Sequence, residues 1–176
     1  MVAQLETFAV GDCHPAREAL ARRLLDCGKL TQPGLDRARR LAEGGGDRLE
    51  RVLAQLGLVS ERDIAETLAA ILELPMACAG DYPQAPVLED QLRPKFLKEA
   101  RILPLADRAT DLVVAMVDPL NEYAASAAAF AADKPVLRFV AYPADFEAAY
   151  DRLYGTGRSE IHDISEETRA RVDAGA

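Results

Sequence analysis

The sequence contains few of the side chains that carry out chemistry. Among its 176 residues there is no tryptophan, and there are only two histidines and three cysteines. Cys13, Cys27 and Cys78 are odd in number and widely spaced, which is typical of a reduced, cytosolic chain. Cys13 adjoins His14, but no second ligand pair follows at a spacing used for metals, and His162 lies in a polar stretch. We therefore expect no metal, no cofactor and no catalytic residues.

Positive charge is also scarce. The chain carries 21 Lys and Arg against 29 Asp and Glu, with a net charge of −8 and an isoelectric point near 4.8. Nucleic acids and anionic membranes attract clustered cations, so neither is expected as a direct partner. No apolar run reaches the roughly 18–20 residues that cross a bilayer. Residues 1–6 lack both the basic start and the apolar core of a signal peptide. We therefore expect no direct membrane insertion.

An internal repeat organises the first half of the chain. A shift of 29 residues superimposes apolar helix positions, a glycine and a helix cap. The superimposed pairs are Leu20 and Leu49, Arg22 and Arg51, Leu24 and Leu53, Gly28 and Gly57, Leu30 and Val59, Thr31 and Ser60, and Leu35 and Ile64. In each copy the glycine ends one helix and the hydroxyl residue caps the next. This pattern predicts two helical hairpins in a four-helix unit with a pseudo-twofold relation.

The helical pattern has clear limits. The first helix is expected from Ala16, a linker is expected at residues 43–47, and Pro75 is expected to stop the fourth helix. A proline-rich connection follows, with short helices expected at residues 88–92 and 94–100.

A second pattern begins at Ile102. Apolar runs at residues 102–105, 112–117 and 136–141 predict three strands. Asn121 is expected to cap a helix between the last two, and a final helix is expected to end at Gly155. The order β-β-α-β-α predicts a small sheet with a right-handed crossover and helices on one face. The chain is therefore expected to have an α+β fold.

These patterns divide the chain into five parts. We expect a flexible lead-in at 1–15, a helical hairpin repeat at 16–75, a proline-rich connection at 76–100, an α/β part at 101–155, and a flexible tail or interdomain linker at 156–176.

The stretch DCGKLTQ resembles the end of a phosphate-binding loop. Such a loop has the pattern G-x-x-x-x-G-K-[ST] between a strand and a helix. Here Arg23 stands at the first glycine position, Leu30 follows Lys29, and the preceding segment has a helical pattern. The lysine does not recur in the second copy, whereas the glycine recurs as Gly57. We therefore predict that Gly28 forms a left-handed turn between two helices and not a nucleotide site.

Three stretches together resemble the N-terminal domain of type II secretion ATPases, the E component. They are RLERVLAQLGLVSERDIAETLAAILELP (48–75), ILPLADRATDLVVAMVDPLNEYA (102–124) and YDRLYGTGRSEI (150–161). The same type of domain precedes type IV pilus assembly ATPases. The resemblance covers roughly residues 17–161, which is most of the chain.

The resemblance implies a docking and regulatory domain. In this family the N-terminal domain binds the cytoplasmic domain of an inner-membrane protein, the L component, and so recruits the hexameric ATPase to the membrane. The Walker motifs lie in a C-terminal ATPase domain of the same chain, which no part of this sequence matches, so we expect this part to be no enzyme. The implied location is cytoplasmic, peripheral at the inner membrane through the partner.

The resemblance also raises an alternative function. A branch of the family binds cyclic di-GMP through both hairpins, with a motif that begins Arg-Leu-Gly and ends in Gln. Here the copies begin Ala19-Leu20-Ala21 and Arg48-Leu49-Glu50, and Ala42 and Ile71 replace the glutamines. An acidic Glu50 would repel a phosphate. The motif-equivalent positions are Leu20, Leu24, Gly28, Arg48, Leu49, Leu53 and Gly57, and we expect the four leucines to be core.

Arginines on helix faces opposite the expected core are candidates for partner contacts. They are Arg22, Arg23, Arg39, Arg40, Arg51 and Arg62. For any single one of them a solvated surface charge is the commoner role. An apolar, aromatic-anchored patch is the alternative source of affinity, and the sequence does not locate it.

Overall fold

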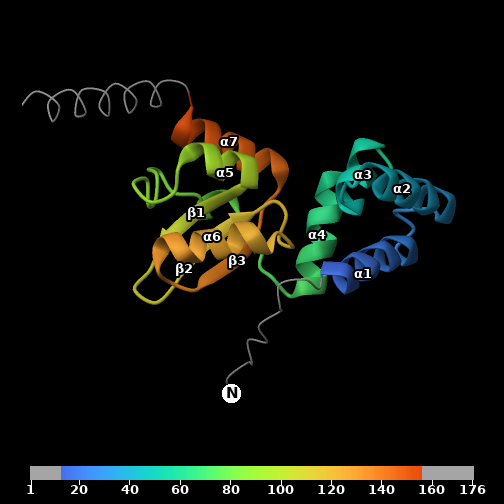
Figure 1. Cartoon of the computed structure of the whole chain (residues 1–176), viewed down its shortest axis with the longest axis horizontal. Coiled ribbons are helices and arrows are strands. Elements are labelled where there is room, and N and C mark those ends of the chain that lie inside the picture. Colours follow the sequence, from blue (N-terminus) through green and yellow to red (C-terminus); the bar gives the residue numbers. More distant parts are fainter. Residues whose placement is uncertain (1–12, 156–176) are drawn as a thin grey trace, which may run out of the picture.

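The computed structural model describes residues 13–155, which form a helical half and an α/β half (Figure 1). The helical half comprises α1 (Cys13–Asp26), α2 (Gln32–Gly45), α3 (Leu49–Gln55) and α4 (Glu61–Leu72). The α/β half comprises the 3-10 helix η1 (Ala79–Asp81), α5 (Pro94–Ala100), β1 (Ile102–Asp107), β2 (Leu112–Met116), α6 (Glu122–Ala132), β3 (Val136–Val140) and α7 (Pro143–Tyr154). The α+β fold class is confirmed. The tail expected at residues 156–176, and residues 1–12 of the expected lead-in, lie outside the described residues.

The two glycines of the repeat form the same turn. Gly28 has a φ of 69°, and the amides of Lys29 and Leu30 both donate to the carbonyl of Leu24, at 2.9 and 3.1 Å. The equivalent bonds recur in the second hairpin, at 3.0 and 3.4 Å, beside Gly57 with a φ of 64°. Glycine enters this left-handed region without the clash that a Cβ would cause. The prediction of a structural turn is confirmed.

The caps that follow these turns are also confirmed. Thr31 accepts a hydrogen bond from the amide of Gly34 at 3.4 Å, and Ser60 accepts one from the amide of Asp63 at 3.1 Å. Lys29 contacts the Asp63 carboxylate at 2.5 Å. This hydrogen bond holds the pKa of Asp63 below its usual value. The lysine of the misleading Gly-Lys pair thus ties the first turn to the start of α4.

The sheet has the predicted connectivity. Its strand order is β1-β2-β3, with β1 and β2 antiparallel and β2 and β3 parallel. Helix α6 connects the parallel strands, and Asn121 caps it by accepting a hydrogen bond from the amide of Ala124 at 3.2 Å. All five residues of the central strand β2 are buried. The sheet is therefore covered on both faces, which differs from the expectation that cover lies on one face only.

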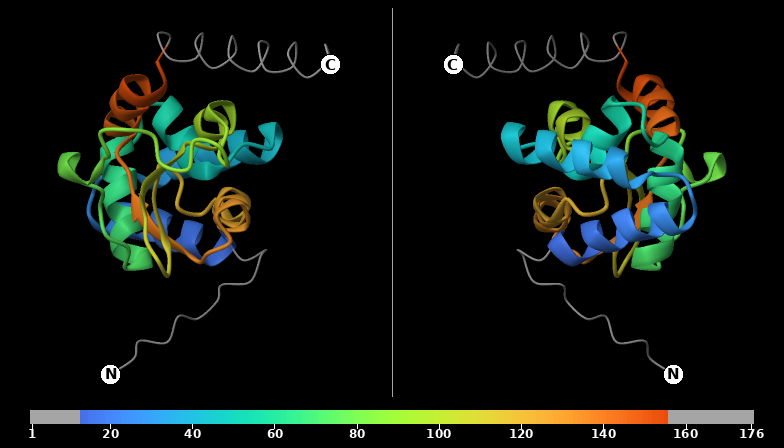
Figure 2. Two further views of the ribbon diagram at one scale, coloured as in Figure 1. Left: turned by 90° about the vertical axis from the view of Figure 1, so that its left-hand side faces the viewer. Right: turned by 90° about the vertical axis from the view of Figure 1, so that its right-hand side faces the viewer.

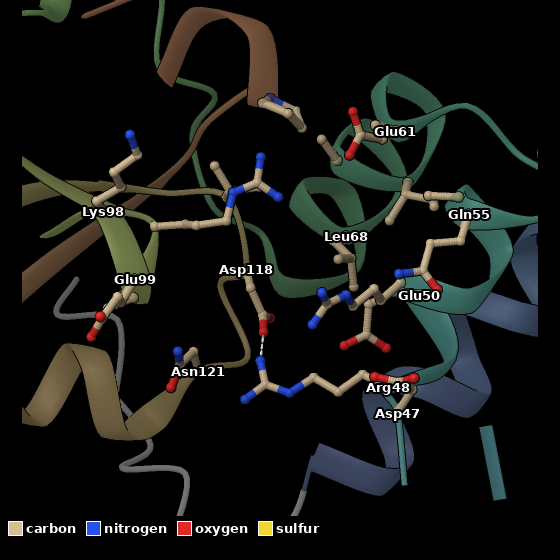
Figure 3. Close-up of a pocket in the computed structure, with 18 of the residues that line it drawn as sticks. Asp47, Arg48, Glu50, Gln55, Glu61, Leu68, Lys98, Glu99, Asp118 and Asn121 are labelled. Atoms are coloured by element: carbon tan, nitrogen blue, oxygen red, sulfur yellow. Dashed lines mark hydrogen bonds and ion pairs between the residues drawn. The ribbon is translucent and has the colours of Figure 1, made fainter. Parts of the chain in front are cut away.

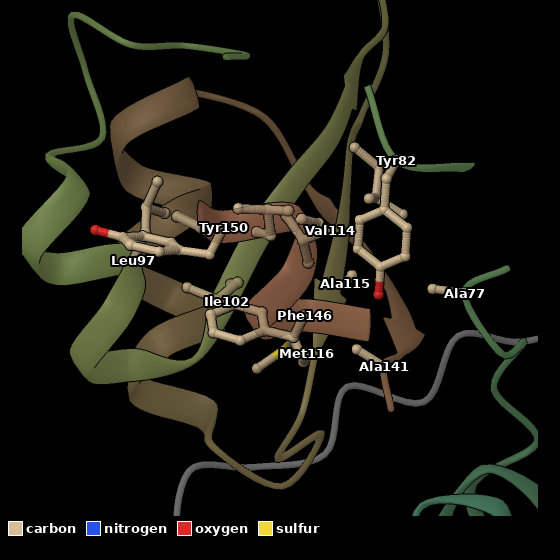
Figure 4. Close-up of a cluster of buried hydrophobic side chains, with 14 of the residues drawn as sticks. Ala77, Tyr82, Leu97, Ile102, Val114, Ala115, Met116, Ala141, Phe146 and Tyr150 are labelled. Atoms are coloured by element: carbon tan, nitrogen blue, oxygen red, sulfur yellow. The ribbon is translucent and has the colours of Figure 1, made fainter. Parts of the chain in front are cut away.

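Each half has its own apolar core. In the α/β half, Phe146 of α7 packs with Ile102 of β1 and Met116 of β2, all fully buried (Figure 4). In the helical half, the corresponding cluster includes Leu53 and also Leu120, which follows β2. The loop after β2 therefore contributes to the core of the other half.

A short seam joins the two halves beside β3. The amide of Val140 donates to the carbonyl of Pro75, and the amide of Ala77 donates to the carbonyl of Val140, both at 2.8 Å. Ala65 and Ala69 of α4 form a small buried cluster with Val140. The segment after α4 thereby pairs with the last residue of β3, at the edge of the sheet. This pairing fixes α4 against the sheet.

Two helix boundaries differ from the prediction. Helix α1 begins at Cys13, three residues earlier than expected. Pro15 is tolerated because amides in the first helical turn have no partner within the helix. The linker predicted at residues 43–47 is wrong in extent, because α2 continues through Gly45. Gly46, with a φ of 68°, ends the helix in the left-handed conformation.

The helix predicted at residues 88–92 is a turn instead. The amides of Gln91 and Leu92 both donate to the carbonyl of Leu88, at 3.0 and 2.9 Å. Leu88 has a φ of 56°, which a right-handed helix does not accommodate. The turn buries Leu92 in the α/β core. The helix predicted at residues 94–100 is confirmed as α5, and η1 is an element that the sequence pattern does not predict.

Replacing Gly28 or Gly57 by alanine is expected to lower the free energy of unfolding by about 1–2 kcal/mol, because the new Cβ strains a left-handed residue. An added Cβ meets no atom within 4 Å at either position, so backbone strain is the sole cause. Gly80→Ala is the matched control, since its Cβ position is equally open and its φ is not positive. Urea unfolding followed by circular dichroism provides the measurement. Equal stability of all three variants would contradict the turn assignment.

Candidate functional site

A cleft of about 800 Å³ lies where the helical half meets the α/β half (Figure 3). One wall comes from α3 and α4, where Gln55 and Glu61 stand at the edge. The opposite wall comes from the end of α5, with Lys98 and Glu99, and from the connection between β2 and α6. Described residues of both halves line this cleft together.

Arg48 crosses this cleft. Its carbonyl accepts hydrogen bonds from the amides of Arg51 and Val52, both at 3.1 Å, so its backbone is fixed at the start of α3. Its guanidinium forms an ion pair with the carboxylate of Asp118, which follows β2 (Figure 3). The other oxygen of Asp118 accepts a hydrogen bond from the amide of Leu120 at 3.0 Å. The one motif arginine that the sequence retains is therefore engaged with the other half.

The remaining charges of the cleft are mixed. Arg51, Lys98 and Arg101 add positive charge. The Nε atom of Arg101 is buried without a hydrogen-bond partner in the described part of the chain, and its Nη2 lies 3.7 Å from the carboxylate of Glu147. The lining acids are Asp47, Glu50, Glu61, Glu99 and Asp118. Such a balance does not produce the concentrated positive potential that attracts a phosphate.

Glu50 is a buried acid at the cleft wall. The residue is 8% exposed, and its Oε2 accepts a hydrogen bond from Arg17 Nε at 3.2 Å. This pair joins α1 to α3. Its Oε1 is buried without a hydrogen-bond partner within residues 13–155. Glu50 stands at the position of the motif glycine, and its carboxylate adds negative charge to the cleft wall.

A second polar group links α4 to the segment before α7. Arg62 donates to Glu66 at 3.0 Å and lies 4.7 Å from the centre of the Tyr142 ring. The Tyr142 hydroxyl donates to the same Glu66 oxygen at 2.9 Å. The hydrogen bonds from Arg62 and Tyr142 lower the pKa of Glu66, and the bond to Glu66 raises the pKa of Tyr142. This arrangement reinforces the seam between the halves.

The leucines at the motif-equivalent positions lie in the helical core. Leu20, Leu24, Leu49 and Leu53 are 0, 1, 8 and 0% exposed. Their side chains pack between the helices and offer little surface for a ligand to contact.

The candidate arginines have different surroundings. Arg39 on α2 pairs with Glu18 on α1 at 2.7 Å, and Arg40 donates to a backbone carbonyl of its own helix at 3.3 Å. Arg51 lines the cleft, and Arg62 is held by the group around Tyr142. Arg39, Arg40 and Arg62 therefore have local structural contacts, whereas the exposed side chain of Arg51 forms no ion pair within residues 13–155.

Arg22 and Arg23 differ from Arg39, Arg40 and Arg62. Both are exposed on α1, and neither forms an ion pair with any residue in the described range.

Most residues that cross the cleft are missed by sequence reasoning. Asp118 lies 70 positions from Arg48, and Arg101 and Lys98 belong to the other half. Hydrophobic periodicity and capping report neighbours within about one turn, so neither detects such a pair. Among the polar residues with which the α/β half lines the cleft, only Asn121 is predicted from the sequence, and only as a helix cap.

The described range offers no other obvious chemical centre. Within residues 13–155 no cluster of three or more His, Cys, Asp or Glu side chains is arranged to hold a metal ion. Within the same range no helix combines the length and the apolar character needed to cross a bilayer.

Several known proteins are similar to this chain in sequence or in fold. Residues 72–160 match the MshEN domain family. The chain is 37% identical over 155 residues to type II secretion system protein E of Xanthomonas campestris, covering 86% of this chain and 27% of that protein. The chain therefore spans about a quarter of that relative's length.

Solved structures extend this similarity. The N-terminal domain of XpsE matches with a TM-score of 0.70 and 33% identity, covering 80% of this chain and 96% of that one. The structure of MshE with cdg matches with a TM-score of 0.61 and 24% identity, covering 77% and 98%, and shows a shared fold. The chain therefore belongs to the MshEN domain family, as the N-terminal domain of a type II secretion or pilus ATPase.

Proposed function

We propose that this domain is a non-catalytic docking and regulatory module of a type II secretion ATPase. It binds the cytoplasmic domain of an L-type inner-membrane protein and so recruits the motor from the cytoplasm to the membrane. The observation that carries the proposal is the share of each relative's length that this chain matches. The chain spans 96% of the XpsE N-terminal domain but 27% of type II secretion system protein E. In this proposal the C-terminal ATPase domain of the full protein hydrolyses the nucleotide. That domain is the second partner of the N-terminal domain, beside the L-type protein.

The charge distribution supports a protein partner. The chain has a net charge of −8, yet Arg22 and Arg23 stand together on the exposed side of α1. A local patch of opposite sign on an acidic body favours one orientation of approach, which accelerates association and selects against wrong partners. The six candidate arginines remain predictions for this interface, and these two are adjacent, exposed and without an ion pair among residues 13–155.

The chain is expected to bind a purified L-type cytoplasmic domain, and Arg22→Glu with Arg23→Glu is expected to slow association about tenfold at low salt. The effect should shrink at high salt, because exposed charges are screened. Biolayer interferometry provides the rates. Arg93→Glu with Lys95→Glu is a control of equal charge change in the α/β half, and it should associate at the wild-type rate. Failure of the wild-type chain to bind any L-type or pilus-type partner would refute the docking function.

Cyclic di-GMP binding is the alternative, and MshE, which shares the fold, has been solved with cdg. Two features of this chain oppose it. Arg48 is paired with Asp118, and Glu50 replaces the glycine of the motif. A ligand would have to compete with Asp118 for the arginine and lie beside a buried carboxylate. Both requirements make the free energy of ligand binding less favourable.

Calorimetry with cyclic di-GMP separates the two functions. We expect no heat of binding up to high micromolar ligand, because the cations of the cleft are balanced by acids. Arg48→Ala should give the same result. Micromolar binding that is lost in Arg48→Ala but retained in Arg40→Ala would instead establish the sensor function.

A further inference from the structure

Helix α6 carries its small side chains inside and its large ones outside. Ala124, Ala125 and Ala128 are at most 3% exposed in the α/β core, whereas Tyr123 is 77% and Phe130 is 90% exposed. Large apolar side chains of a surface helix normally face the core. Figures 1 and 2 show α6 on the outer side of the α/β half. Its aromatic face is therefore directed to solvent.

The exposed face of α6 is continuous and uncharged. Tyr123, Ser126, Ala127 and Phe130 have the i, i+3, i+4, i+7 spacing that places side chains on one face of a helix. After Glu122 the helix contains no charged residue. At 1.5 Å per residue the two rings stand about 10 Å apart along the axis. This spacing is that of two anchors entering one groove.

The charges at the ends of α6 are largely neutralised. Glu122 receives two hydrogen bonds from the guanidinium of Arg138, at 2.5 and 2.6 Å, and Lys134 pairs with Asp107 at 2.6 Å. Asp133, at the C-terminal end of the helix, is exposed and has no ion-pair partner within residues 13–155. It adds to the negative end of the helix dipole. A complementary surface would be apolar along the helix and basic at this end.

The size of the face argues against a second copy as its occupant. Two aromatic side chains bury on the order of 300–500 Å² in total. A stable interface needs about 800 Å² from each partner. A self-complementary contact through α6 alone would therefore be too small. A partner with groove walls surrounds the helix and adds area that a matching convex helix does not.

We propose that α6 is the anchoring helix of the docking interface. The partner's cytoplasmic domain receives Tyr123 and Phe130 in an apolar groove and places a basic side chain beside Asp133. This assignment rests on the docking function proposed above and locates it. The arginines of α1 then steer the approach, while the two rings provide the contact that slows dissociation.

The test measures the affinity of the chain for a purified L-type cytoplasmic domain by calorimetry. Phe130→Ala and Tyr123→Ala are each expected to weaken binding tenfold or more. Alanine is the better helix former and both positions are exposed, so the variants should keep the wild-type melting temperature. Leu41→Ala is the matched control, because Leu41 is also an exposed apolar residue, at 48%, on α2 of the other half. Asp133→Asn keeps a residue that tolerates the left-handed backbone, and in biolayer interferometry it should slow association severalfold at low salt.

The outcomes separate this inference from the docking function. Wild-type binding that survives both aromatic substitutions overturns the role of α6 and leaves docking intact. Equal losses in the α6 variants and in Leu41→Ala also overturn it, because the effect is then not specific to α6. Failure of the wild-type chain to bind overturns both proposals.

Two further measurements examine other occupants of the face. Sedimentation should show a monomer at 100 μM, and vesicles of phosphatidylethanolamine and phosphatidylglycerol should not bind, since α6 contains no Lys or Arg. A dimer, or vesicle binding, that disappears in Phe130→Ala would assign the face to that occupant instead and overturn the groove.

Discussion

The arrangement of the two halves depends on the hydrogen bonds that Val140 makes with the segment after α4. They add Pro75 and Ala77 to the end of β3, and Ala65 and Ala69 then pack against the same residue. A backbone pairing of this kind has a defined register, so it fixes the position of α4 along the strand as well as its distance. The contacts across the cleft depend on that register together with the packing of Leu120 into the helical core.

The meeting of Arg48 and Asp118 illustrates this dependence. An exposed ion pair contributes about 0–1 kcal/mol, which is too little to hold two parts of a protein together. The pair forms because the seam and the core around Leu120 have already brought both residues to the same place. The consequence for ligand binding is correspondingly modest. An anionic ligand that used Arg48 would have to displace Asp118, at a cost no larger than the free energy of that pair.

Local features of the fold could be predicted from the sequence, and relations across the cleft could not. The turns at Gly28 and Gly57 depend on φ and on carbonyls within one helical turn, so residue type and spacing identify them. The run of three glycines ending at Gly46 leads to the wrong prediction of a linker at residues 43–47. The first two glycines are tolerated within α2, and the single left-handed residue Gly46 ends the helix. The helix predicted at residues 88–92 is wrong for another reason. Leu88 has a positive φ, and leucine gives no local sequence signal for that conformation. Asp118 and Arg101 line the same cleft as α3 because the seam brings the two halves together, which no periodicity encodes.

The inverted pattern of α6 follows from its position in the chain. The helix connects two adjacent parallel strands, and alanines let it lie close to the sheet. The bidentate bond between Glu122 and Arg138 then fixes its start to β3. The helix is thus attached through its alanines and Glu122, and the exposed rings of Tyr123 and Phe130 add little to the core of the domain. Rings on a rigid helix lose little freedom when they enter a groove, so most of the free energy of their burial is available for binding. A helix whose largest side chains add nothing to its own core is best explained by a surface outside the domain that buries them.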